Sequence, residues 1–247
     1  MKSALYLIAA STLFFSTAEA GNYCDSTKTK KIHIGNDEGF KHWQGLDIGF
    51  SGWLTRDNSI DLPEAWRDME IDNARSFAFA WNMHQHNFHL YKNYINVGTG
   101  LGLEWNSYAF RENITLGINT PRLTATLDSI NYAKNKLRTC FVNVPVMLDF
   151  NTSEDEDRAF HLSAGVKFGY NVFRNRQVQK FYENDGDDKE KRVIKDDYYV
   201  NPFRYSLMAR VGYGDYTLFA DYALSEMFRS AKGPQVTPFT VGLHIAL

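Results

Sequence analysis

Polar and apolar side chains alternate at every second position along most of the chain. In residues 43–54, WQGLDIGFSGWL, the side chains of Leu46, Ile48 and Phe50 share one face, and Asp47 and Gly49 share the other. A period of two predicts a β-strand with one apolar and one polar face. The same alternation recurs in seven further segments, 76–91, 94–105, 139–150, 159–173, 203–213, 216–228 and 238–247.

The connections between these eight segments alternate in length. Short turns such as Lys92-Asn93 and Gly214-Asp215 follow the second and sixth segments, whereas longer loops follow the first, third, fifth and seventh. A closed up-and-down sheet with an even number of strands places all its short turns on one rim and all its long loops on the other. The predicted fold class is therefore all-β, an eight-stranded up-and-down antiparallel β-barrel.

The two faces of the segments distinguish a soluble barrel from a transmembrane barrel. A lipocalin-like carrier turns its apolar residues inward around a ligand, and a membrane barrel turns them outward toward lipid. The fifth segment offers seven apolar positions from Phe160 to Val172, a span of about 20 Å. That length favours the transmembrane barrel, with a lumen polar network formed by Asp47, Glu104, Asn143, Lys167, Arg210, Asp221 and His244. A lumen filled in this way is a plug and not a pore, because an eight-stranded barrel is just wide enough for its own side chains.

The first 20 residues carry one Lys, an apolar run and an Ala-Glu-Ala ending. This pattern is typical of a secretory signal peptide. We therefore expect a signal peptide at 1–20, a periplasmic N-terminal arm at 21–42 and the barrel domain at 43–247. Export would permit Cys24 to pair with Cys140, and two unpaired thiols remain an equal alternative. A formal net charge of −2 gives no indication of a nucleic-acid partner.

Several stretches together resemble a known family. HWQGLDIGFSGWL, GTGLGLEW, FVNVPVMLDF, GYGDYTLFADYALSEMF and PFTVGLHIAL are similar to the PorT-like outer-membrane β-barrel proteins of Bacteroidetes. The resemblance covers about residues 43–247. It implies an integral barrel in the outer membrane of a Gram-negative bacterium and, in some members, a link to protein secretion or assembly. It supplies no catalytic residue.

Two groups of residues could carry chemistry. His84 and His86 would point the same way from one strand and could hold a metal if a third ligand joined them, whereas His89 would face away. The simpler interpretation, histidines hydrogen-bonded in the lumen or at its rim, is preferred, so no metal and no cofactor are predicted. A barrel-wall lipid acyl hydrolase or acyltransferase could use His161, Ser163 and His244, oriented by Asp221 or Glu104. Such a trio arises by chance in a polar lumen, so no catalytic residues are predicted.

The chain ends in an apolar strand that resembles the signal read by the barrel assembly machinery, with Thr240, Gly242, Ile245 and Leu247 as its marked positions. Both the acid-rich loop 55–76 and the charged loop 174–197 are expected to be solvated. The resulting hypothesis is a non-enzymatic outer-membrane barrel that acts as an anchor, scaffold or surface-binding protein. Expected partners are outer-membrane lipid, the assembly machinery and a secretion-complex or surface partner. The lipid enzyme and the soluble carrier remain the alternatives.

Overall fold

The structure is a computed structural model that describes residues 42–91, 94–117, 119–153, 160–182 and 189–246. The expected signal peptide, residues 21–41 of the expected arm, Cys24 and Leu247 lie outside this described part. No helix in the described residues is long and apolar enough to cross a membrane.

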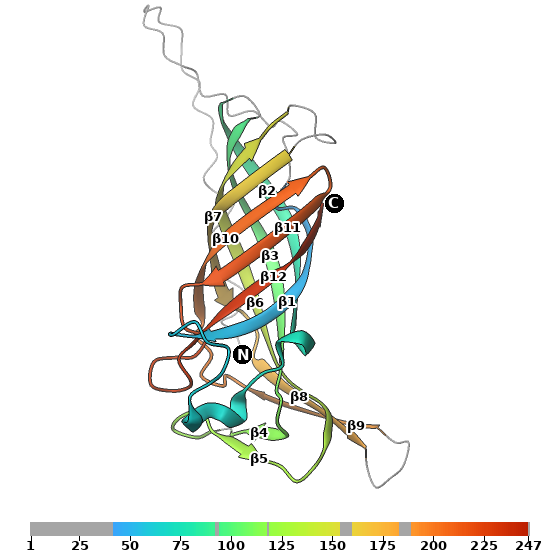
Figure 1. The fold of residues 1–247 in the computed structure, drawn as a ribbon, viewed down its shortest axis with the longest axis vertical. Helices are drawn as coiled ribbons and strands as arrows, with labels where there is room; N and C mark the ends of the chain where they lie inside the picture. Colours follow the sequence, from blue (N-terminus) through green and yellow to red (C-terminus); the bar gives the residue numbers. More distant parts are fainter. Residues whose placement is uncertain (1–41, 92–93, 118, 154–159, 183–188, 247) are drawn as a thin grey trace, which may run out of the picture. The chain divides into compact units, whose positions relative to one another are not determined.

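Eight antiparallel strands of the described chain close into a barrel (Figure 1). The strands pair in the order β3-β2-β1-β12-β11-β10-β7-β6, and the pairing of β3 with β6 closes the ring. The predicted eight-stranded up-and-down antiparallel barrel is therefore confirmed. Its strands are β1 (Gly45–Thr55), β2 (Phe77–Tyr91), β3 (Ile95–Ala109), β6 (Tyr132–Asn151), β7 (Phe160–Asn171), β10 (Phe203–Tyr213), β11 (Tyr216–Ala223) and β12 (Val236–Ala246).

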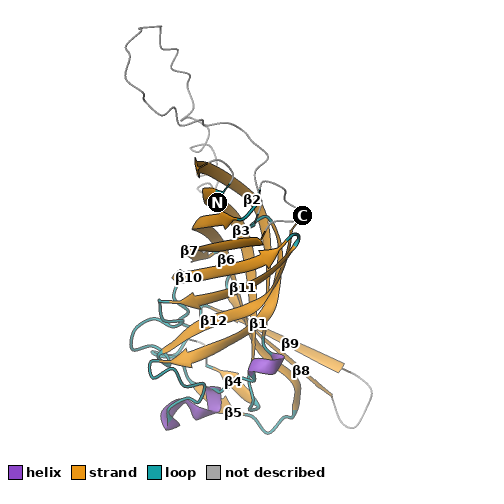
Figure 2. Cartoon of the chain, turned by 45° about the horizontal axis from the view of Figure 1, so that its top comes forward, coloured by secondary structure: helices purple, strands orange, loops and turns teal. Residues whose placement is uncertain are grey.

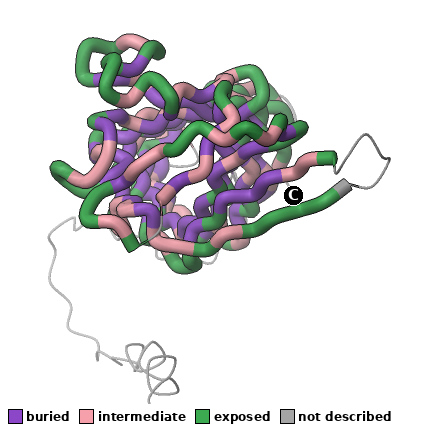
Figure 3. Tube along the Cα trace, turned by 90° about the horizontal axis from the view of Figure 1, so that it is seen from below, coloured by how far each residue is buried: buried purple, intermediate pink, exposed green. Residues whose placement is uncertain are grey.

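Burial alternates along these strands, as Figure 3 shows in a view from the long-loop end. In β7, for example, Leu162, Phe168 and Tyr170 are about half exposed, whereas Ser163 and Lys167 are buried. Large apolar side chains thus cover the outside of the barrel and polar ones fill its inside. This is the reverse of a soluble barrel, in which the apolar faces point inward.

The wall begins two residues later than the sequence pattern predicts. Trp43 was expected in the first strand, but β1 starts at Gly45, and residues 42–44 run inside the barrel. The φ angle of Gly45 is 145°, and a Cβ added there would lie 2.1 Å from the carbonyl oxygen of Ile245. Only glycine tolerates this geometry, so Gly45 lets the chain turn from the lumen into the wall.

The long loops fold into a small cap with an apolar core of its own, at the bottom of Figure 1 and below the barrel wall in Figure 2. The cap contains η1 (Glu64–Met69), η2 (Asn73–Arg75), β4 (Ile114–Leu116) paired with β5 (Ala125–Leu127), and β8 (Asn175–Tyr182) paired with β9 (Lys189–Asp196). Its core consists of Trp53, Leu62, Met69, Ile71, Tyr108, Phe110, Ile114, Leu116, Leu123, Leu137, Phe141, Tyr198, Val200, Met227, Phe228 and Val236.

The expectation of solvated loops was wrong for both loop segments. Leu62, Met69 and Ile71 anchor the first loop in the apolar core, because they are the apolar positions between its charges. In the second loop, β8 pairs with the first part of β6, and Gln177 and Gln179 are fully buried against β4. The loop contains a β-hairpin that the sequence pattern did not predict, because charged residues occupy most positions that do not face the cap core.

Candidate functional site: the filled lumen

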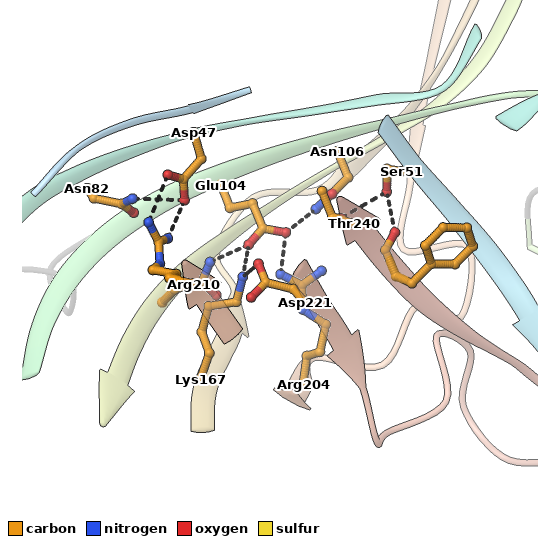
Figure 4. A network of polar contacts seen from close by, with 12 residues as sticks. Asp47, Ser51, Asn82, Glu104, Asn106, Lys167, Arg204, Arg210, Asp221 and Thr240 are labelled. Atoms are coloured by element: carbon orange, nitrogen blue, oxygen red, sulfur yellow. Dashed lines mark hydrogen bonds and ion pairs between the residues drawn. The ribbon is translucent and has the colours of Figure 1, made fainter. Parts of the chain in front are cut away.

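The candidate site is the barrel lumen, where buried charged groups gather in two clusters. Figure 4 shows side chains from both clusters, with Asp47 directed toward Arg210 and Glu104 directed toward Lys167 and Arg204. The Glu104 cluster consists of Glu104, Lys167, Arg204 and Asp221 with Asn106 and Asn143, and the Asp47 cluster consists of Asp47, Arg210 and His244 with Asn82. All seven residues predicted for the lumen network lie in these two clusters and are buried.

Glu104 on β3 is the centre of its cluster. Its carboxylate accepts hydrogen bonds from Arg204 Nη2 at 2.6 Å and from Lys167 Nζ at 2.9 Å. Asn143 and Asn106 donate to the same carboxylate at 2.6 and 2.8 Å. Lys167 also donates to Asp221 Oδ2 at 2.5 Å, so two carboxylates face two cations. This balance matters because a buried charge without a partner costs several kcal/mol.

The Asp47 cluster follows the same principle with fewer charges. Arg210 Nη2 lies 2.7 Å from Asp47 Oδ2, and His244 Nδ1 lies 2.6 Å from Asp47 Oδ1. Asn82 Nδ2 donates to Asp47 at 2.9 Å. These groups come from β1, β2, β10 and β12, and the contact of Arg210 with Asp47 joins β10 to β1, which are not neighbours in the wall.

Residues 42–44 fill the remaining space beside Asp47. The Trp43 ring lies 4.8 Å from the Arg210 guanidinium, and the backbone N–H of Trp43 donates to Gln85 Oε1 at 2.6 Å. His42 stacks on His161 with ring centroids 4.0 Å apart. A Cβ on Gly100 would lie 2.8 Å from the Trp43 ring, so this glycine makes room for the indole. The lumen is therefore occupied by the chain itself.

The candidate catalytic trio is buried but not arranged as a triad. His161 Nε2 bonds to Thr217 Oγ1 at 2.7 Å, and His244 bonds to Asp47. The expected orienting acids, Asp221 and Glu104, bond to Lys167 instead. Asp47 is thus the carboxylate beside a candidate histidine, because β1 and β12 are neighbours at the seam of the barrel.

The histidines of β2 lie on both faces of the wall. A register shift between Asn82 and His84 places His84 and His86 on the outer face and Gln85 inside. The His86 ring packs edge-on against Phe88, 4.6 Å between centroids. Simple alternation from Asn82 would have turned this pair inward, and a β-bulge of this kind leaves no signal in the apolar pattern.

The strand β12 carries the residues expected to form an assembly signal. Thr240 is buried and its hydroxyl lies 3.4 Å from Ser51 Oγ, whereas Ile245 is on the outer face. Gly242 lies opposite Gly49, where an added Cβ would be 2.2 Å from the Ile48 carbonyl oxygen. The backbones of β1 and β12 pair along their full length, which removes the free sheet edges at this seam.

Sequence reasoning missed Arg204 and the lumen segment at residues 42–44. Arg204 has the same parity in β10 as Arg210, so the alternation contained the signal that would have found it. Cys140 is a buried free thiol in the described chain.

Comparison with known proteins agrees with this geometry. Residues 68–229 match the family model described as outer membrane protein beta-barrel domain. The chain belongs to this family of outer-membrane β-barrels. No curated protein and no solved structure matches the chain. The apolar outer face of the barrel therefore contacts membrane lipid. Barrels of this kind typically have short turns on the periplasmic rim and longer loops on the extracellular rim.

Proposed function

We propose that this outer-membrane barrel is a closed, non-enzymatic anchor that holds a folded cap at the cell surface for binding a partner. The observation that carries the proposal is the apolar core of the cap, which joins residues from the wall strands to residues from the long loops. Trp53 of β1, for instance, packs against Phe110 and Phe228 with centroids 6.4 and 5.7 Å apart. A cap fixed to the wall in this way presents a defined surface at little entropic cost on binding.

A specific place on the cap suits a partner. A pocket of about 280 Å³ lies between η1 and the segment that leads into β5, and it is lined by Trp66, Asp68, Met69, Arg122 and Leu123 among others. Aromatic residues, methionine and arginine are enriched at protein interfaces, and Trp66, Met69 and Arg122 supply all three types to this pocket. We infer that this pocket takes a protruding side chain of a protein partner.

The narrower resemblance to PorT-like proteins of Bacteroidetes makes a secretion or assembly complex the first partner to seek. The barrel assembly machinery is the proposed partner during biogenesis, reading the β12 strand. A barrel-wall lipid enzyme is the weaker candidate, because the hydrogen bonds of His161 and His244 go to Thr217 and Asp47.

The test is affinity purification of the tagged full-length protein from cross-linked outer membranes. The double variant Asp68→Lys/Arg122→Glu should lose a co-purifying protein that the wild type retains. The variant Asp215→Lys, on the short turn at the opposite rim, is the matched control and should keep it. Recovery of the same proteins with both variants, or of none with the wild type, would refute a binding role for this pocket.

A further inference from the structure

One outer face of the cap carries positive charge alone. Where β8 and β9 extend the sheet from the first part of β6, three rows of side chains point to the same side as the lipid-facing residues of β6. The row nearest the membrane pairs Arg138 with Arg176, and Arg176 with Lys195. The most distant row pairs Lys134 with Lys180, and Lys180 with Lys191.

The middle row completes this surface, which we call the basic face. It pairs Lys136 with Val178, and Val178 with Val193. Seven of the nine positions are thus Lys or Arg, and none is acidic. Like charges directly opposite each other in a sheet are destabilising, so the arrangement costs stability unless an anion covers it.

The basic face has few anionic neighbours in the described chain. Burial and the neighbouring Lys134 and Arg138 lower the pKa of Lys136, and the nearby Asp72 raises it only weakly. Arg174 lies 3.8 Å from Asp196, at the edge of the face. None of the salt bridges among the described residues involves the three cations of the first row, Arg138, Arg176 and Lys195.

The height of the basic face is set by the wall strand that carries it. Along β6 the outward side chains are apolar from Val142 to Phe150. Arg138 lies four residues before Val142, about 13 Å away along the strand toward the cap. Aromatic side chains lie at this level on both neighbouring strands, with Trp105 paired to Cys140 and Tyr170 paired to Val142. Aromatic girdles mark the membrane–water interface in such barrels. The first basic row therefore lies at the level of the lipid headgroups.

A recess connects the two layers. Trp105, Arg138, Phe173, Arg174 and Arg176 line a pocket of about 190 Å³, so three arginines and two aromatic residues share its lining. Figure 1 shows the β8–β9 hairpin projecting sideways from the long-loop end of the barrel. A hairpin in this position extends over the surface of the surrounding lipid.

We propose that the basic face binds the phosphate groups of lipid headgroups in the outward leaflet, with Arg138 and Arg176 as the main contacts. Guanidinium groups bind phosphate oxygens through two parallel hydrogen bonds, and the paired arginines on adjacent strands give one phosphate two such donors. The bound lipid keeps its chains against the outer face of β6 and β3. Binding would hold the β8–β9 hairpin, and with it the cap, in a fixed orientation to the membrane.

The test uses full-length protein in neutral detergent and titrates it with lipid A carrying two phosphates, followed by native mass spectrometry. We expect saturable binding that weakens as salt increases. The triple variant Arg138→Gln/Arg176→Gln/Lys195→Gln should bind at least about tenfold more weakly, because each surface cation contributes to the attraction of anionic lipid. Lipid A with one phosphate should bind more weakly than the form with two.

Three controls separate this proposal from its alternatives. The variant Arg56→Gln/Arg67→Gln removes two exposed arginines elsewhere on the long-loop side and should bind like wild type. The charge-preserving variant Arg138→Lys/Arg176→Lys should bind more weakly than wild type and more tightly than the triple variant, because lysine keeps the charge but cannot form the two parallel hydrogen bonds. This milder replacement keeps the proposal testable if the glutamine variants fold poorly. Equal binding by wild type and the triple variant, or inorganic phosphate competing at the same concentration as the lipid, would overturn the assignment.

Discussion

The lumen and the cap exclude water by opposite means. In the lumen, charged and amide side chains meet each other across an enclosed space, as Glu104 meets Lys167 and Arg204. In the cap, apolar side chains such as Leu116 and Phe228 pack in the centre, with charges outside. The difference follows from what surrounds each region. Lipid surrounds the wall strands, so their apolar side chains point outward, whereas water surrounds the loops, so their polar side chains point outward. The wall and the cap of one chain therefore have opposite arrangements of apolar and polar side chains.

The largest expected effect comes from breaking the Glu104 cluster. Replacing Glu104 by Ala leaves Lys167 and Arg204 with one carboxylate between them, and loss of one partner from a buried ion pair costs about 3–5 kcal/mol. Urea unfolding of the protein in lipid vesicles, followed by tryptophan fluorescence, should show a decrease of this size in the free energy of unfolding. Glu112→Ala, at an exposed loop position, is the control. Equal stability of the two variants would mean that the cluster does not stabilise the barrel.

A smaller and more local effect is expected from the cap. Leu116 is 1% exposed, and its replacement by Ala should destabilise the cap by about 2–4 kcal/mol through the lost contacts and the cavity. Limited proteolysis of intact cells should cut the long loops faster, while the heat-dependent shift in gel mobility that reports a folded barrel is kept. Ile60→Ala, at a 52% exposed position, should leave proteolysis unchanged. Loss of the gel shift in the Leu116 variant would show that cap and barrel unfold as one unit.

A smaller effect is expected from a substitution at Gly45, where the lumen segment joins the wall. Gly45→Ala places a Cβ at a φ of 145° and against Ile245, and such backbone strain costs about 1–3 kcal/mol. The expected result is slower assembly into vesicles, measured as the fraction that acquires the folded gel mobility over time. The control is Gly233→Ala in the cap, where φ is not in the left-handed region and the contacting atoms belong to the Phe228 side chain. Unchanged assembly of the Gly45 variant would argue against a required glycine at this turn.

The smallest expected effect is a pH dependence confined to the cap. Thr115 and Tyr132 donate hydrogen bonds to the Asp128 carboxylate, and these bonds lower its pKa. Because the pKa is lowered in the folded state, the stabilisation is present above the usual pKa of about 4 and is lost as the pH falls below it. Asp128→Asn should make cap proteolysis less sensitive to acid between about pH 6 and 3. A wild-type acid response in this variant would assign the sensitivity to other groups.

The sequence predicted the barrel better than the cap for a physical reason. Alternation persists through each wall strand because one face meets lipid and the other meets the lumen, so the strand count and both faces could be inferred. The cap has short elements and scattered apolar anchors such as Met69 and Leu123, and its core forms only when distant loops meet. The contacts within the lumen depend on register, and no sequence pattern specifies that Asp47 meets Arg210, or that Trp43 turns inward.

We propose that the chain fills its own barrel and makes it a plug. Single-channel recording of the full-length protein in a planar lipid bilayer tests this most directly. The Glu104 and Asp47 clusters and Trp43 are buried in the lumen, so we expect a bilayer current at the baseline of protein-free membranes. Stable, uniform conductance steps of the size that open porins give would contradict it.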